Sequence, residues 1–121
     1  MILLDTDHLS VLVFPESSRG QALGARLQAS SDQEIGTPIV TAEEQIRGWL
    51  ATISRERLVT RQVYGSRRLL EQINLLARWT LIPFDGQAAA EFERLRDSSV
   101  RRLGTRDLKI ASTALTRGAL L

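Results

Sequence analysis

The chain opens with Met1-Ile2-Leu3-Leu4-Asp5-Thr6-Asp7, a short apolar run that a carboxylate ends abruptly. Such a run predicts a strand that is buried on both faces, as in a parallel sheet. Open α/β sheets bind their ligands at the carboxyl ends of the strands, so Asp5 stands where chemistry is expected. The alternative is that Asp5 caps the following helix, which Asp often does. The two roles are compatible, and we favour the functional one.

Two further acids stand at comparable positions. Glu44 follows the second apolar run, Ile35 to Val40, and Asp107 opens the last amphipathic segment. Carboxylates that meet at one sheet edge repel each other, and a divalent cation relieves the repulsion; their hard oxygens select Mg²⁺ or Mn²⁺. The simpler interpretation of each acid is that it complements a helix dipole in the first turn. Glu43 also lies near the apolar face of its helix, so spacing does not choose between Glu43 and Glu44.

The rest of the chain alternates apolar runs with amphipathic segments, which predicts a parallel sheet covered by helices on both faces. Pro38 predicts a strand edge or a bend in the second strand. Thr41 and Glu44 have the spacing of a capping box, and Asp85 is expected to cap the fifth helix. Strands are expected at Ile2–Asp5, Ile35–Val40 and Thr80–Phe84, with a fourth beginning at Ala119–Leu121. Helices are expected from the first strand to Pro15 and over residues 16–30, 41–53, 60–78, 87–97 and 105–117, the last stopping at Gly118.

Composition narrows the class of protein. At 121 residues the chain is the size of one domain. It has no cysteine and a single histidine, His8, which excludes zinc sites built from thiolates or several histidines. We find no apolar stretch of membrane-spanning length and no basic start of a signal peptide, so we expect a cytoplasmic protein with no membrane partner.

The positive charges are almost all arginine, since Lys109 is the only lysine, and the net charge is +2. Arginine binds phosphate in a bidentate manner and stacks on bases, which favours a nucleic-acid partner; a GC-rich genome explains the same bias equally well. Residues 47–68 hold six arginines against Glu56, a pattern that suits a phosphate backbone or a solvated helix face. Near Asp107, the arginines either meet substrate or neutralise an acidic pocket; they are Arg101, Arg102 and Arg106.

Three segments together resemble the PIN domain, and most of all ribonuclease toxins of the VapC type. They are Leu3-Leu4-Asp5-Thr6-Asp7, Val40-Thr41-Ala42-Glu43-Glu44-Gln45-Ile46-Arg47-Gly48 and Gly104-Thr105-Arg106-Asp107-Leu108-Lys109-Ile110-Ala111. Similar family members carry a Glu four residues before a Gly, so by resemblance Gly48 selects Glu44. The resemblance runs over essentially the whole chain. It implies a single PIN-like domain over residues 1–121, a three-layer sandwich whose central parallel sheet is flanked by helices.

The resemblance also implies an activity: Mg²⁺- or Mn²⁺-dependent endonucleolytic cleavage of RNA that leaves a 5′-phosphate and a 3′-hydroxyl. The protein would be the toxin of a type II toxin–antitoxin pair, a homodimer with a small antitoxin as partner. The implied catalytic and metal-binding residues are Asp5, Glu44 and Asp107. Thr6, Asp7 and Thr105 are implied as supporting residues, and Arg47, Arg101, Arg102 and Arg106 as contacts to RNA.

The sequence departs from the family pattern at two points. The family usually has Asn where this chain has Asp7, and it places a fourth polar or acidic residue after the next strand, in a Thr-x-Asn/Asp segment. The sequence reaches Leu121 before that segment, so we expect a domain whose last strand is truncated. This leaves a second interpretation, a catalytically impaired PIN-like module that binds RNA or protein. A more distant one is a haloacid-dehalogenase-like phosphatase, because Asp5-Thr6-Asp7 matches its Asp-x-Asp opening and Lys109 is the one candidate lysine.

Overall fold

The computed structural model of this protein describes residues 1–98 and 103–119. Strands and helices alternate along this part of the chain, as the sequence predicts. In order, the elements are β1 (Ile2–Leu3), α1 (Thr6–Leu12), α2 (Ser18–Ala29), β2 (Ile35–Pro38), α3 (Ile39–Arg55), α4 (Val59–Leu76), β3 (Thr80–Ile82), α5 (Gly86–Arg96) and α6 (Thr105–Arg117).

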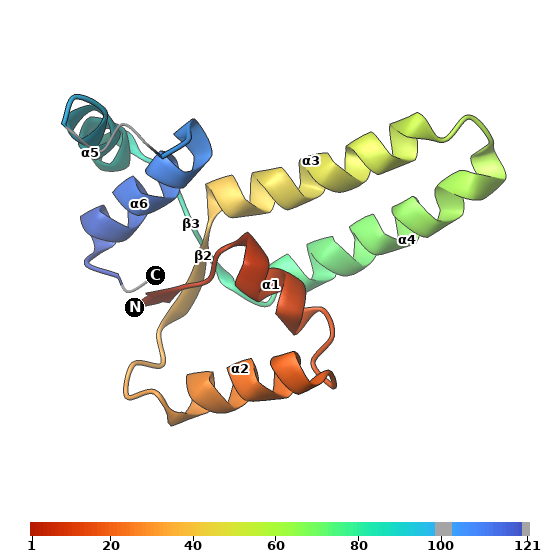
Figure 1. Cartoon of the computed structure of the whole chain (residues 1–121), viewed down its shortest axis with the longest axis horizontal. Helices are drawn as coiled ribbons and strands as arrows, with labels where there is room; N and C mark the ends of the chain where they lie inside the picture. The colour runs from red at the N-terminus through yellow and green to blue at the C-terminus, as the bar shows by residue number, and fades with distance from the viewer. Residues whose placement is uncertain (99–102, 120–121) are drawn as a thin grey trace.

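The three strands form one parallel sheet in the order β1-β2-β3 (Figure 1). Ile2 lies opposite Ile35, and Thr37 lies opposite Leu81. All three strands therefore point their carboxyl ends to the same edge of the sheet, where α1 and α3 begin. The predicted parallel sheet is confirmed.

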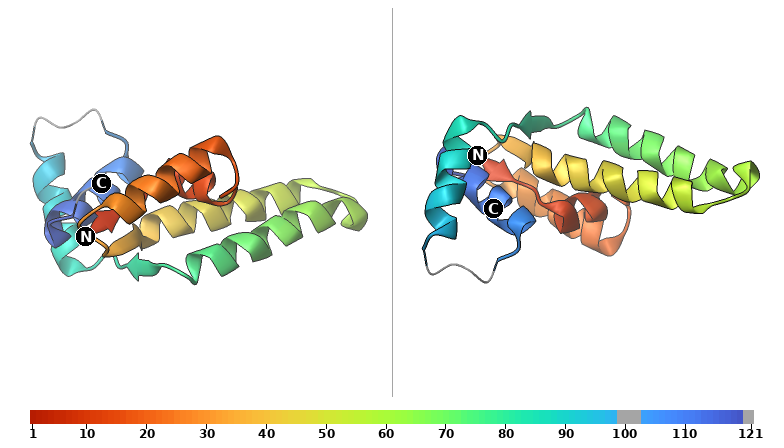
Figure 2. Two further views of the ribbon diagram at one scale, coloured as in Figure 1. Left: turned by 90° about the horizontal axis from the view of Figure 1, so that it is seen from below. Right: turned by 90° about the horizontal axis from the view of Figure 1, so that it is seen from above.

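Helices cover both faces of this sheet, and the first strand shows why. Leu3 and Leu4 are consecutive, so their side chains point to opposite faces, and both are almost completely buried. Leu4 packs in a cluster with Leu9 of α1 and Leu76 of α4, whereas Leu3 packs with side chains of β3 and α6. The views in Figure 2 accordingly show α5 and α6 on one side of the sheet and α1 to α4 on the other.

The predicted helix ends at Asp85 and Gly118 are confirmed. The Asp85 carboxylate accepts a hydrogen bond of 3.0 Å from the backbone N–H of Ala88 and so caps α5. Gly118 ends α6 in the left-handed conformation, with φ of 59°, which Gly adopts without the strain of a side chain.

The capping box at Thr41 is wrong, because α3 begins two residues earlier, at Ile39. Pro38 ends β2 and is itself the N-cap of α3; its φ of −61° suits the entry to a helix, and no loop separates the two elements. Thr41 is completely buried, and its hydroxyl has no hydrogen-bond partner in the described part of the chain. Of the two alternatives predicted for Pro38, a position on an edge strand is wrong because β2 is the central strand; Pro38 is its last residue, where the chain passes directly into α3.

Other boundaries differ by a few residues. The helix α1 ends at Leu12, before Pro15, and Phe14 is exposed beyond it. Of the expected fourth strand at Ala119–Leu121, the last two residues lie outside the described residues.

Helices α3 and α4 form a long hairpin that projects away from the sheet (Figures 1 and 2). Their contact contains an edge-to-face pair of Trp49 and Tyr64, whose ring centroids lie 6.2 Å apart. Gly65 allows the close approach, because a Cβ there would lie 2.9 Å from Cγ1 of Ile53. None of the helices in the described ranges is long and apolar enough to cross a membrane.

Candidate active site

The three acids singled out in the sequence, Asp5, Glu44 and Asp107, line one cavity of about 290 Å³. Asp5 follows β1, Glu44 lies in the second turn of α3 after β2, and Asp107 lies in the first turn of α6. The full lining consists of Asp5, Thr6, Asp7, Glu44, Leu103, Arg106, Asp107, Ile110 and Ala111. The cavity therefore lies where the carboxyl ends of β1 and β2 meet α6, as a parallel sheet predicts for a ligand site.

Asp5 has both of the roles that its position allows. It is the N-cap of α1, because its Oδ1 accepts a hydrogen bond of 3.1 Å from the backbone N–H of His8. Nδ1 of the His8 ring lies 2.6 Å from the same oxygen. Burial raises the pKa of Asp5, but the hydrogen bonds and the charge that His8 supplies outweigh burial and hold this pKa below its usual range. The Asp5 carboxylate is therefore ionised while it lines the cavity.

Both carboxylate oxygens of Glu44 are bound by other side chains. The Thr6 hydroxyl donates a hydrogen bond of 2.8 Å to Oε2. Arg106 forms an ion pair with Oε1, which connects α6 to α3. Gln45 supports this arrangement, because its side-chain amide donates a hydrogen bond of 3.3 Å to the carbonyl oxygen of Thr6.

The neighbouring Glu43 faces solvent and pairs with Arg47 one turn further along α3. The structure therefore places Glu44 in the cavity and Glu43 outside it. Spacing alone left both residues open, and the resemblance selected Glu44.

The remaining predicted residues are divided between the cavity and its surroundings. Asp107 is more than half exposed and lies 3.7 Å from Nε of Arg106. Thr6 and Asp7 line the cavity, whereas Thr105 is exposed at the first position of α6. Of the predicted RNA contacts, Arg106 lines the cavity and Arg47 is exposed on α3; Arg101 and Arg102 lie outside the described residues.

The acids share the cavity without converging on one point. Within residues 1–98 and 103–119, no three His, Cys, Asp or Glu side chains come close enough to hold one metal ion. The sequence predicted that Arg106 either meets substrate or neutralises an acidic pocket. It could not predict that Arg106 pairs with Glu44, because the two residues are 62 positions apart in the chain.

Lys109, the one lysine, lies 5.5 Å from the centre of the Phe84 ring and is not part of the cavity lining. The haloacid-dehalogenase-like interpretation depends on Lys109 as its one candidate lysine, and Lys109 does not line the cavity with Asp5 and Asp7. The placement of Lys109 therefore disfavours the phosphatase interpretation.

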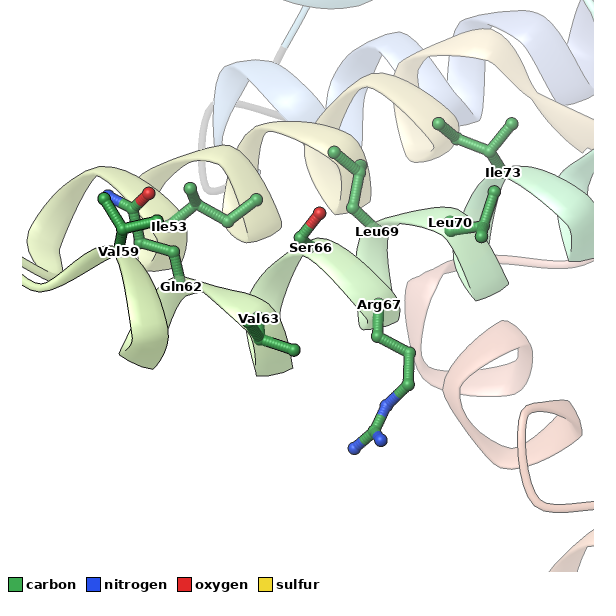
Figure 3. Close-up of a pocket in the computed structure, with 9 residues that line it drawn as sticks. All are labelled: Ile53, Val59, Gln62, Val63, Ser66, Arg67, Leu69, Leu70 and Ile73. Carbon is green, nitrogen blue, oxygen red and sulfur yellow. The ribbon is translucent and has the colours of Figure 1, made fainter.

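A larger cavity, of about 710 Å³, lies on the α3–α4 hairpin (Figure 3). Its walls are mostly apolar, and Arg67 is the one charged residue that lines it; in Figure 3 this side chain extends away from Leu69 and Ile73. No carboxylate lines this cavity, so the acidic cavity is the candidate for chemistry.

A parallel sheet covered on both faces, with acids from three distant segments in a cavity at its carboxyl edge, defines an α/β protein with a candidate hydrolytic site. The chain belongs to the PIN domain family, whose profile matches residues 2–121. Its fold is similar to that in the crystal structure of FitAcB from Neisseria gonorrhoeae, with a TM-score of 0.63 and 23% sequence identity over 98% of this chain and 84% of that chain. A comparison with curated proteins gave no match.

Proposed function

We propose that this protein is a metal-dependent endoribonuclease that acts as the toxin of a type II toxin–antitoxin pair. The observation that carries the proposal is the single cavity that Asp5, Glu44 and Asp107 line together, although they are distant in the sequence. Membership of the PIN domain family supports the proposal from a second side.

The chemistry of the cavity suits a hard divalent cation. Its lining contains four carboxylates and one arginine, which leaves an excess of negative charge at neutral pH. No three acids of the described residues come close enough to hold one ion together, so Asp5, Glu44 and Asp107 would hold it partly through water, with Asp7 beside them. When bound, Mg²⁺ or Mn²⁺ lowers the pKa of a coordinated water and neutralises phosphate charge.

In this proposal, residues around the acids hold the Glu44 carboxylate in its orientation. Thr6 fixes the rotamer of Glu44 through its hydrogen bond to Oε2, and Gln45 holds the backbone of Thr6. Neither His nor Lys lines the cavity in the described part of the chain, so no side chain there is an obvious general base. This lining suits hydrolysis in which the attacking water is activated without a protein base. The resemblance to VapC-type toxins implies products with a 5′-phosphate and a 3′-hydroxyl.

Arginines supply the contacts to RNA in this proposal. Arg106 stands in the cavity and Arg47 is exposed on α3, three residues after Glu44. Phosphate contacts of this kind predict that binding weakens as the salt concentration rises. The proposal also includes a small antitoxin partner and a homodimer, both inferred from the resemblance to VapC-type toxins.

The test is cleavage of a mixed panel of structured and single-stranded RNAs with Mg²⁺ or Mn²⁺ and with EDTA. Glu44→Gln removes an acid from the cavity, and Glu43→Gln is its matched control on the same helix. We expect cleavage that EDTA abolishes, that Glu44→Gln and Asp5→Asn reduce by at least about 100-fold, and that Glu43→Gln leaves unchanged. Equal losses in Glu44→Gln and Glu43→Gln would show that the cavity is not the active site.

One observation favours a second candidate function, an RNA- or protein-binding module with impaired catalysis. Glu44 is already neutralised by Arg106, as expected for a site that holds no metal. RNA binding without cleavage, equal in the presence and absence of Mg²⁺, would support this alternative.

A further inference from the structure

The Arg106 guanidinium lies between two of the acids that the proposed function assigns to the metal. It is paired with Oε1 of Glu44, and its Nε is 3.7 Å from Oδ1 of Asp107. The other oxygen of Glu44 accepts the hydrogen bond from Thr6. Each oxygen of Glu44 thus already has one partner, and a cation that approaches Oε1 competes with Arg106 for it.

A metal ion and this guanidinium stabilise the same carboxylates and repel each other. Coulomb repulsion between a divalent ion and a unit charge several ångströms away disfavours the state that contains both. We propose that Arg106 is an internal counter-ion that competes with the metal for Glu44: it neutralises the cavity of the metal-free protein and must leave before the ion binds. This inference rests on the proposed function, since it assumes that the acidic cavity binds the metal.

Arg106 is suited to such an exchange. Its side chain is 53% exposed, whereas that of Glu44 is 31% exposed, so the arginine can swing into solvent while the acid stays at the cavity. An ion pair that is this exposed stabilises a protein only weakly. Once displaced, the guanidinium stands at the mouth of the cavity, where a phosphate of the RNA can replace Glu44 as its partner.

The chain offers a matched control away from the cavity. Arg94 pairs with Glu91 on α5, and neither residue lines the cavity. Arg106→Gln and Arg94→Gln therefore remove the same charge and the same kind of ion pair, one at the cavity and one away from it.

The experiment is direct Mn²⁺ binding by the RNA-free protein, measured from the free-Mn²⁺ signal in electron paramagnetic resonance at constant ionic strength. We expect Arg106→Gln to lower the dissociation constant for Mn²⁺ by about three- to tenfold, from the lost competition and the lost repulsion. Arg106→Lys keeps the charge and is expected to bind Mn²⁺ as the unmodified protein does, and Arg94→Gln is expected to have no effect. Circular dichroism of each variant confirms that it is folded.

The outcomes separate this inference from the proposed function. One outcome keeps the metal site and overturns the counter-ion role. In that outcome the unmodified protein binds Mn²⁺, Glu44→Gln abolishes the binding, and Arg106→Gln leaves the affinity for Mn²⁺ unchanged. Weaker binding in Arg106→Gln also overturns the inference, because Arg106 would then organise the site. If neither the unmodified protein nor Arg106→Gln binds Mn²⁺, both the inference and the proposed metal site are wrong.

Discussion

Asp5 serves as helix cap and as candidate metal ligand, and two substitutions at this one position separate the two roles. Asp5→Ala removes the hydrogen-bond acceptor and the charge, whereas Asp5→Asn removes the charge and keeps an oxygen that can accept from the backbone N–H of His8. Asn and Asp are about equally good N-caps. We therefore expect Asp5→Asn to lose catalysis with little loss of stability, and Asp5→Ala to lose both.

The expected loss of stability follows from the contacts of the carboxylate. Its cap hydrogen bond is 3.1 Å long, and α1 has only seven residues, with Leu9 completely buried against the sheet. Replacing an N-cap acid by Ala costs about 1 kcal/mol. The contact with the His8 ring adds little, because the Asp5 and His8 side chains are 34% and 50% exposed. For a chain of this length, 1 kcal/mol lowers Tm by about 3–5 °C.

The assay is urea unfolding of the metal-free protein, followed by circular dichroism for the unmodified chain and both variants. If Asp5→Asn lost as much stability as Asp5→Ala, the charge rather than the cap would hold α1, and the assignment of roles would be wrong. If Asp5→Ala lost no stability, the cap would be energetically irrelevant.

Two further predictions concern stability. Gly65→Ala is expected to lower the free energy of unfolding by about 1 kcal/mol. The new Cβ would lie 2.9 Å from Cγ1 of Ile53, and an overpacking cost of about 2 kcal/mol exceeds the gain of about 1 kcal/mol in helix propensity. Gly48→Ala, on the exposed face of α3 with no atom within 4 Å of the new Cβ, is expected to raise the free energy of unfolding by about 1 kcal/mol; urea unfolding that moves both variants in the same direction would contradict the close approach of α3 and α4. The Met1 ammonium donates a hydrogen bond to the Asp32 carboxylate and holds the pKa of Asp32 below its usual value. This contact therefore stabilises the fold above about pH 4, and the stabilisation is lost as the pH falls through the lowered pKa. The free energy of unfolding, measured from pH 6 down to pH 2, should fall less steeply in Asp32→Asn than in the unmodified protein.

Much of the fold could be predicted because local chemistry and tertiary structure agree. Leu3 and Leu4 form an apolar pair in which both residues need burial, and the sheet supplies it on its two faces. Asp85 and Gly118 are local signals that depend on a few neighbouring backbone groups, so they were predictable from the sequence alone.

The start of α3 could not be predicted in the same way. Thr41 and Glu44 have the spacing of a capping box, but that motif assumes a loop before the helix. Here Pro38 ends the central strand and opens the helix, and the burial of Thr41 decides against capping.

The candidate site shows a similar division. The positions of Asp5 and Asp107 follow from strand and helix ends, whereas the choice of Glu44 over Glu43 depends on the rotation of α3 against β1 and α6. Only the assembled fold shows that Thr6 and Arg106 bind the two oxygens of Glu44.

The projecting α3–α4 hairpin is expected to unfold locally before the rest of the protein. Away from the sheet, α3 and α4 are covered mainly by each other, and Val59, Val63 and Leu70 of α4 are more than half exposed. A helix pair that buries so few apolar side chains needs less free energy for local unfolding than a sheet that is packed on both faces. Glu44 lies at the sheet end of α3, so its backbone amide should remain protected from hydrogen exchange after the amides near the tip of the hairpin have exchanged. Opening of the tip and integrity of the acidic cavity are therefore separate events.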